Sequence, residues 1–307
     1  MRIGIYTSAG PGASLSALMA KFEQIDSAGF HTAWLGQLFD YDALTALALA
    51  ARSTHRVELG SWVIPTYPRH PAALAQQALT VQAAASGRLA LGIGVSHHTV
   101  IADRFGLDFT HPVRHAAEYI DILRPLLHGE RVDCEGTEFR AALKLDFEPR
   151  VVAPPLLLAA LGPKMLELAG RSADGAAIWL GGARYLEEFA IPRLIDAALR
   201  ANRPEPRIVC GLPVAITSDP EAGRLSAHEF TQQSSRLPSY RRVLERQDLA
   251  SAADVALIGD EIEILDALDH LAVLGVTDFN AILFPVQGDR DATNRTFEFL
   301  ARLARLS

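Results

Sequence analysis

The sequence is poor in cysteine, in lysine and in long apolar runs. Only Cys134 and Cys210 occur among 307 residues, and their wide separation excludes a disulfide framework and a cysteine-based zinc site. No apolar stretch reaches the roughly 20 residues that a membrane-spanning helix needs. The 29 Lys and Arg, of which only three are lysines, stand against 36 Asp and Glu, and the resulting net charge of −7 argues against a generally basic surface for nucleic acid.

Signals for export and for several enzyme classes are also missing. The N-terminal Met1-Arg2-Ile3-Gly4-Ile5-Tyr6 enters a strand-like run at once, so no signal peptide is expected and the protein is expected to be cytoplasmic. There is no nucleophile elbow, no Walker loop and no H-E-x-x-H motif. Ser96 and His97 are consecutive, which is not how a catalytic triad is built. These absences favour an enzyme whose cofactor supplies the difficult chemistry.

What the sequence does contain is a repeated alternation of short apolar runs with longer segments of helical spacing, the pattern of parallel strands covered by helices. Eight such units predict an α/β fold, the (β/α)8 or TIM barrel. The turn Ser8-Ala9-Gly10-Pro11-Gly12 lacks the spacing of a dinucleotide-binding motif, which argues against a doubly wound sheet. The expected strands cover residues 2–6, 32–35, 57–63, 89–95, 155–161, 176–180, 208–217 and 277–285.

Two segments interrupt the alternation. Residues 131–139 alternate around a Glu-Gly turn and predict a short inserted hairpin. Residues 219–262, after the seventh strand, are irregular, and within them 228–248 forms either a lid over the barrel mouth or an amphipathic surface helix. No shift in composition marks a linker, so we expect one domain over residues 1–307.

Functional side chains of a barrel lie where strands end. Trp34, Trp62 and Trp179 are the only tryptophans and fall at or near such ends, where they either flank a flat ligand or fill the core. The loop of residues 61–71, which contains Tyr67 and Arg69, leads from the third strand into a helix that Pro71 opens. By itself this loop is only a stiff connection.

The fourth strand ends in Gly94-Val95-Ser96-His97-His98. Glycines in a strand allow a ligand to approach closely, and histidines at a strand end are candidates for hydrogen bonding or proton transfer. The alternatives are a pair of loop histidines or a metal site, for which no third ligand has a telling spacing.

The sixth strand ends in Trp179-Leu180-Gly181-Gly182. A glycine pair before a helix presents backbone N–H groups to an anion such as phosphate, with Arg184 nearby, or else serves only to turn the chain.

The ordered set of motifs resembles the luciferase-like monooxygenases and their deazaflavin-dependent relatives, over nearly the whole chain. Within that superfamily the sequence looks most similar to the coenzyme F420-dependent oxidoreductases. The segments that carry the resemblance are 2–5, 28–35, 60–71, 87–94, 173–176 and 257–261.

The resemblance implies hydride transfer to or from coenzyme F420, a ring system in the barrel mouth, a small-molecule substrate and a homodimer. Gln37 and Leu38 fall where relatives that oxidise a sugar phosphate carry Asp and His, and this departure favours reduction of another substrate. The resemblance also implies a non-prolyl cis peptide at Ser61-Trp62. A membrane, nucleic acid or metal partner is not expected.

By the same resemblance, the cofactor-binding residues are Gln37, Ser61, Trp62, Val63, Gly94, Val95, Ser96, His97, Trp179, Leu180, Gly181 and Gly182. His97, His98 and Tyr67 are the candidate proton donors, and Arg69 and Arg184 the candidate partners of an anionic tail. Three alternatives stay open: an FMN-dependent monooxygenase, a barrel that binds a flavin-like ligand without catalysis, and a metal-dependent barrel hydrolase.

Overall fold

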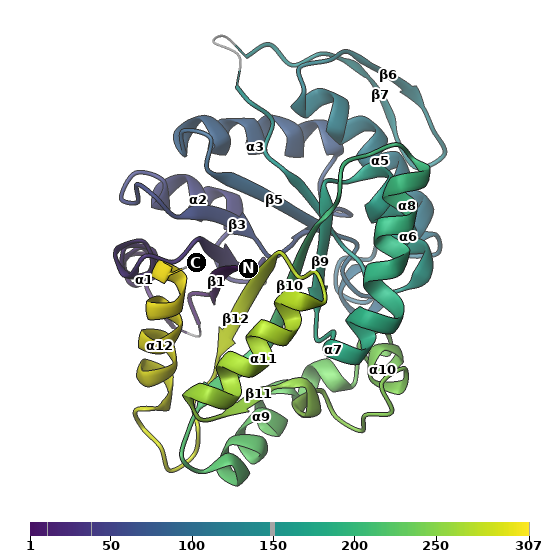
Figure 1. Ribbon diagram of the computed structural model, residues 1–307. Coiled ribbons are helices and arrows are strands. Elements are labelled where there is room, and N and C mark those ends of the chain that lie inside the picture. The colour runs from purple at the N-terminus through teal and green to yellow at the C-terminus, as the bar shows by residue number, and fades with distance from the viewer. Residues whose placement is uncertain (11, 38, 148–150, 307) are drawn as a thin grey trace.

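A closed barrel of eight parallel strands organises the computed structural model, which describes residues 1–307 apart from residues 11, 38, 148–150 and 307 (Figure 1). The pairing of β9 with β10 closes the barrel, so the (β/α)8 prediction is confirmed. The barrel strands are β1 (Arg2–Thr7), β2 (Thr32–Leu35), β3 (Glu58–Ser61), β5 (Leu89–Gly94), β8 (Leu156–Ala159), β9 (Gly175–Trp179), β10 (Arg207–Ile216) and β12 (Asp278–Leu283). Two short strands, β4 (Ile64–Pro65) and β11 (Leu257–Gly259), pair in parallel with β5 and β10, respectively.

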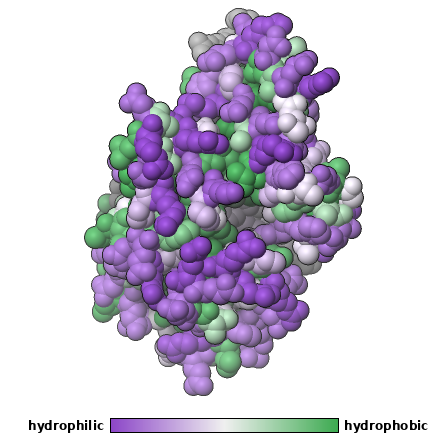
Figure 2. All heavy atoms as spheres, turned by 90° about the vertical axis from the view of Figure 1, so that its right-hand side faces the viewer, coloured by the Kyte–Doolittle hydropathy of each residue, from purple (hydrophilic) through white to green (hydrophobic). Residues whose placement is uncertain are grey.

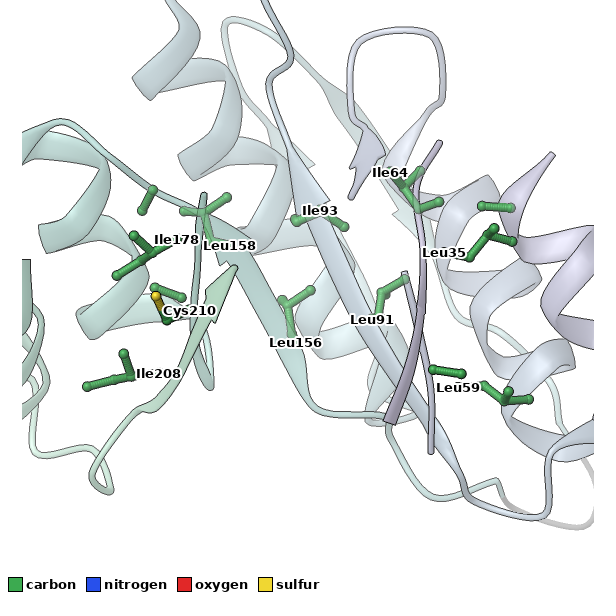
Figure 3. Close-up of a cluster of buried hydrophobic side chains, with 14 of the residues drawn as sticks. Leu35, Leu59, Ile64, Leu91, Ile93, Leu156, Leu158, Ile178, Ile208 and Cys210 are labelled. Atoms are coloured by element: carbon green, nitrogen blue, oxygen red, sulfur yellow. The ribbon is translucent and has the colours of Figure 1, made fainter. Parts of the chain in front are cut away.

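Helices surround the barrel (Figure 1). They pack on the outward-facing side chains of the strands. Alternate residues such as Leu91, Ile93 and Leu158 face these helices and form the main core (Figure 3). This follows from the two-residue period of a strand, which sends the intervening side chains into the barrel. The surrounding helices are α1 (Leu15–Ala28), α2 (Ala43–Ala50), α3 (Pro71–Ala84), α5 (Pro112–Leu127), α6 (Pro163–Ser172), α8 (Ile191–Arg200), α11 (Glu261–Val273) and α12 (Ala292–Leu306).

Local sequence signals fix several helix ends. The Ser14 side chain accepts a hydrogen bond from the Ala17 N–H at the start of α1, and Gly29 ends that helix with a φ of 90°. Asp260 and Glu263 form a capping box at the start of α11. The outer faces of these helices are polar, and hydrophilic residues cover most of the side of the molecule that Figure 2 shows.

The two interruptions differ in outcome. The predicted hairpin is present as the antiparallel pair β6 (Val132–Glu135) and β7 (Arg140–Leu143). The segment after β10 is more regular than the sequence indicates. It contains α9 (Pro220–Ser235), α10 (Pro238–Glu245), a short 3-10 helix (Ala252–Val255) and β11, and its mostly polar composition explains why no apolar periodicity marks these helices. No helix within the described residues is long and apolar enough to cross a membrane.

The barrel interior has a charged lower layer and an aromatic middle layer. At the N-terminal ends of the strands, Arg207 forms ion pairs with Glu58 and Asp278, 2.6 Å from an oxygen of each. Above this layer the fully buried Trp34 fills the interior, and a Cβ on Gly60 would lie 2.1 Å from its ring. The glycine therefore makes room for the indole.

Candidate functional site

A cavity of about 1170 Å³ opens where the carboxyl ends of the barrel strands meet their loops. It exceeds the usual size of a site for one small ligand and offers room for a cofactor together with a substrate. Strand ends supply part of its lining, namely Tyr6, Ala159, Ala177, Trp179 and Ile282, while Trp62, Val63 and His97 come from the segments that follow β3 and β5. The cavity therefore lies on the face of the barrel where enzymes of this fold have their active sites.

A second hollow, of about 520 Å³, lies on the outside of the barrel, against α6 and α8. Its charged lining includes Lys164, Arg171 and Arg200, but no strand end reaches it. The cavity over the barrel is for this reason the candidate active site.

Two tryptophans form the floor of this cavity. A Cβ on Gly211 would lie 2.7 Å from Cζ2 of Trp62 and 3.3 Å from Cε3 of Trp179, so only glycine at this point of β10 lets both indoles lie over the strand. Trp34 lies below them, with its ring centroid 5.5 Å from that of Trp62 and no exposed surface. Of the two alternatives that the sequence leaves for the tryptophans, Trp34 follows the second and fills the core of the barrel.

A bulge after β3 positions Trp62 and Val63. The Ser61 hydroxyl is buried, donates to the Gly92 carbonyl at 2.9 Å and accepts from the Gly92 N–H at 2.8 Å. Gly94 continues the contact, because a Cβ there would lie 2.9 Å from Cγ2 of Val63 and 3.0 Å from Cβ of Ala159. A non-prolyl cis peptide is present, but it joins Trp62 to Val63. The prediction of a cis bond at Ser61-Trp62 is thus wrong by one residue.

The turn after β5 brings His97 to the cavity. Val95 packs on the core, and Ser96 adopts a left-handed conformation with a φ of 60° that turns the chain. His97 then lies in the cavity lining, where burial lowers the pKa of its imidazole below the ordinary value. The ring meets Tyr240 of α10 edge-on, with centroids 5.2 Å apart, and its Nδ1 lies 3.4 Å from the Ser239 hydroxyl.

The other two candidate proton donors lie outside this lining. His98 begins the short helix α4 (His98–Ile101), is largely exposed and lies 3.4 Å from a carboxylate oxygen of Asp103. Tyr67 stacks on His115 with ring centroids 3.7 Å apart, and burial raises the pKa of its phenol to about 12. Of the three candidates, His97 is the one that the fold brings to the cavity.

The remaining predicted cofactor residues, Gln37 and the turn after β9, contact other parts of the protein. The side-chain oxygen of Gln37 accepts a hydrogen bond from the Ala43 N–H at 2.8 Å, at the start of α2. Leu38 lies outside the described residues. At the end of β9, Leu180 has a φ of 60°, and both glycines that follow are buried. A Cβ on Gly182 would lie 2.5 Å from the Gln247 side-chain oxygen, so the segment after α10 covers this turn.

The two arginines predicted to meet an anion are both paired with carboxylates. Arg69 forms an ion pair with Asp42. Arg184 lies 2.6 Å from Asp248 and 3.3 Å from Glu188.

Several cavity residues escape sequence reasoning. Tyr6 ends β1 inside the cavity, and burial together with the nearby Asp40 raises the pKa of its phenol. Tyr240 and its neighbours on α9 and α10 form one wall, so part of the segment 228–248, which the sequence leaves as either a lid or a surface helix, lies at the mouth. Phe39 and Arg104 stand at the rim. The position of Tyr6 at a strand end was a usable signal, whereas the other residues lie on elements that only the folded chain brings there.

No group of three or more His, Cys, Asp or Glu in the described part of the chain is arranged to hold a metal ion.

Residues 1–278 match the family model of the luciferase-like monooxygenases. A putative coenzyme F420-dependent oxidoreductase of Mycobacterium tuberculosis is 35% identical over 307 aligned positions, which cover 93% of this chain and 85% of the relative. The F420-dependent glucose-6-phosphate dehydrogenase of Beutenbergia cavernae is 33% identical over 59% of this chain and 55% of its own length.

Two solved structures show the same fold. An F420-dependent secondary alcohol dehydrogenase, solved with an F420-acetone adduct, has a TM-score of 0.79 at 16% identity and covers 98% of this chain and 97% of its own. An oxygenating Baeyer-Villiger component from Pseudomonas putida, solved with FMN, has a TM-score of 0.77 with the same identity and coverage. The chain is an enzyme of the luciferase-like monooxygenase family, with relatives among the F420-dependent oxidoreductases.

Proposed function

We propose that the protein is a coenzyme F420-dependent oxidoreductase that transfers a hydride between the deazaflavin and a small organic substrate. The observation that carries the proposal is the cavity floor of Trp62 and Trp179, with His97 beside it. The 35% identical relative, named as a putative F420-dependent oxidoreductase, supports the choice of cofactor.

The residues present fit a flat tricyclic ring. Ala159 and Ala177 leave space above the strands, and the absence of a side chain at Gly211 keeps the two indoles low. Four further residues belong to the proposed site because their backbone positions Trp62, Val63 and His97. They are Ser61, Gly94, Val95 and Ser96. When bound, the deazaflavin would supply a two-electron hydride donor or acceptor.

Proton transfer is the task that we assign to His97. In its protonated form the imidazole can give a proton to the atom next to the one that receives the hydride, so that a reduced double bond gains one hydride and one proton. The lowered pKa makes this form a stronger acid. Tyr240 shields the ring from water, and the Ser239 hydroxyl lies beside Nδ1, where it can donate or accept, so Nε2 is the nitrogen left for the substrate.

The turn of Leu180, Gly181 and Gly182 is the proposed site for the cofactor phosphate. Gln247 and Val255 lie against Gly182, within 3 Å of where its Cβ would stand. A phosphate that approaches the turn from that side would displace the segment after α10, in the manner of a lid. The homodimer that the family resemblance implies remains a prediction.

The second candidate is an FMN-dependent monooxygenase, favoured by a fold similarity to an FMN-bound oxygenating enzyme that is close to the one with the F420-dependent enzyme. A side-by-side titration with coenzyme F420 and FMN, followed by ligand fluorescence and thermal shift, separates the two. Tight binding of F420 with little FMN binding is expected. Preference for FMN would move the protein to the oxygen-using branch, and binding of neither would overturn both assignments.

A further inference from the structure

The rim of the cavity carries an exposed aromatic pair and one cation. Phe39 is 58% exposed and Phe105 is 46% exposed, with ring centroids 6.2 Å apart. The guanidinium carbon of Arg104 lies 4.8 Å from the centroid of the Phe39 ring. Phe39 and Arg104 belong to the cavity lining together with His97, and Phe105 lies beside Phe39. We call Phe39, Phe105 and Arg104 the rim cluster.

Arg104 differs from Arg69 and Arg184, the two arginines that the sequence suggests for an anion. Arg69 and Arg184 are held by carboxylates, whereas Arg104 makes no ion pair with another described residue. Its neighbour Asp103 lies against His98. Asp40 is the one carboxylate among the described lining residues, and its charge helps to raise the pKa of the Tyr6 phenol. The charge of Arg104 is therefore available to a ligand.

Exposed phenyl rings at a cavity mouth indicate a surface that a ligand covers, because such area is otherwise unfavourable in water. A cation that lies over one ring selects for a ligand with a negative group next to its apolar body. From these two features we infer that the rim cluster of Phe39, Phe105 and Arg104 is a substrate subsite for a planar or aromatic compound that carries an anionic group. The inference rests on the proposed function in taking this cavity as the place of reaction, and it adds the substrate class.

Two fluorescent probes of similar shape test the subsite without any cofactor. They are 8-anilinonaphthalene-1-sulfonate, which is anionic, and its neutral parent N-phenyl-1-naphthylamine. Arg104→Gln should weaken binding of the sulfonate about five- to tenfold and change that of the neutral probe less than about twofold, because only the charge-assisted contact is lost. Phe39→Ala should weaken both probes by about threefold.

The matched control is Arg131→Gln, which removes an exposed arginine on the remote hairpin and should leave both probes unchanged. Thermal unfolding of each variant verifies that the fold is intact. Unchanged sulfonate binding in Arg104→Gln, or equal weakening of both probes, would overturn the subsite.

An anion at the rim has a second possible source, the phosphate-bearing tail of the cofactor. Coenzyme F420 and the phosphate-free deazaflavin that carries only the ribityl chain are therefore titrated against wild type and Arg104→Gln. The inference expects equal affinities in both proteins for each compound, and sulfonate binding that persists when F420 is saturating. Selective loss of F420 affinity in the variant would assign Arg104 to the cofactor and overturn the substrate class. Failure of wild type to bind F420 would instead count against the proposed function, since the probe experiment is read without it.

Discussion

The charged groups at the N-terminal end of the barrel are paired with each other, whereas two groups at the C-terminal end have no carboxylate partner in the part of the chain that the structure describes. At the N-terminal end, Arg207 is surrounded by Glu58 and Asp278, and Arg2 lies against the same two carboxylates. At the C-terminal end, His97 and Arg104 face a cavity, and neither has a carboxylate partner among the described residues. A polar group with its partners supplied stabilises the fold, whereas one without them is available to a ligand. The N-terminal end of the barrel therefore stabilises the fold, and the C-terminal end offers groups that can bind a ligand.

The largest expected effect is on stability, from Arg207→Ala. The variant leaves the largely buried carboxylates of Glu58 and Asp278 without their main cation, which costs about 3–5 kcal/mol. Urea unfolding followed by circular dichroism measures the change. Arg200→Ala, which removes an exposed pair with Asp196, is the control and should cost less than about 0.5 kcal/mol. Similar losses of unfolding free energy in the two variants would show that the buried ion pairs of Arg207 stabilise the protein no more than an exposed pair does.

The next effect is on turnover at the opposite end. His97→Ala should lower turnover about a hundredfold, because a general acid typically contributes that much, and should weaken cofactor binding less than about threefold. Steady-state kinetics and F420 titration measure the two quantities. The adjacent His98→Ala is the matched control, since His98 is exposed and lies outside the cavity lining. Equal turnover in the two variants would remove His97 from the mechanism.

The pH dependence of the free energy of unfolding tests the burial of His115, which stacks on Tyr67. Burial lowers the pKa of His115 to about 4, while the unfolded chain has an ordinary value of about 6.5. Between these values the unfolded state binds a proton that the native state does not, so stability falls as the pH drops from about 7 to about 4, by roughly 1–3 kcal/mol.

The variant His115→Gln retains a polar group for Thr66, whose hydroxyl lies 3.0 Å from the imidazole. It should flatten this part of the pH profile. An unchanged slope would show that other groups produce it.

The smallest effect is expected from Tyr67→Phe. The phenol ring stacks on His115 outside the cavity lining, so turnover should stay within about twofold of wild type. A larger loss of turnover would restore Tyr67 as a candidate proton donor and would show that the active site reaches beyond the cavity lining.

Sequence patterns anticipate the barrel because its signals are local. A run such as Leu89–Gly94 is apolar at every position, as a strand covered on both sides must be, and the Ser14 and Asp42 caps mark helix starts. The site is only partly readable from such signals. His97 and Trp62 follow strand ends and can be predicted to lie at the mouth, and Trp34 shows the limit of that rule because neighbouring glycines let it sink into the barrel.

The missed residues depend on packing between distant segments. Tyr240 reaches His97 only because α10 folds back over the mouth, across 143 positions of the chain. Arg104 stands out only when Arg69 and Arg184 are seen to be paired. Neither fact has a periodic or motif signature.

The central claim is that the cavity over the barrel holds the deazaflavin, and a space-filling variant tests it most directly. Ala159 lies in the lining at the end of β8 and is partly exposed there, so Ala159→Phe should occupy the space above the strands. Fluorescence titration with coenzyme F420 is expected to show binding weakened more than about tenfold, with thermal unfolding close to that of wild type. Unchanged F420 affinity in a folded variant would contradict the account, because the cofactor would then bind elsewhere.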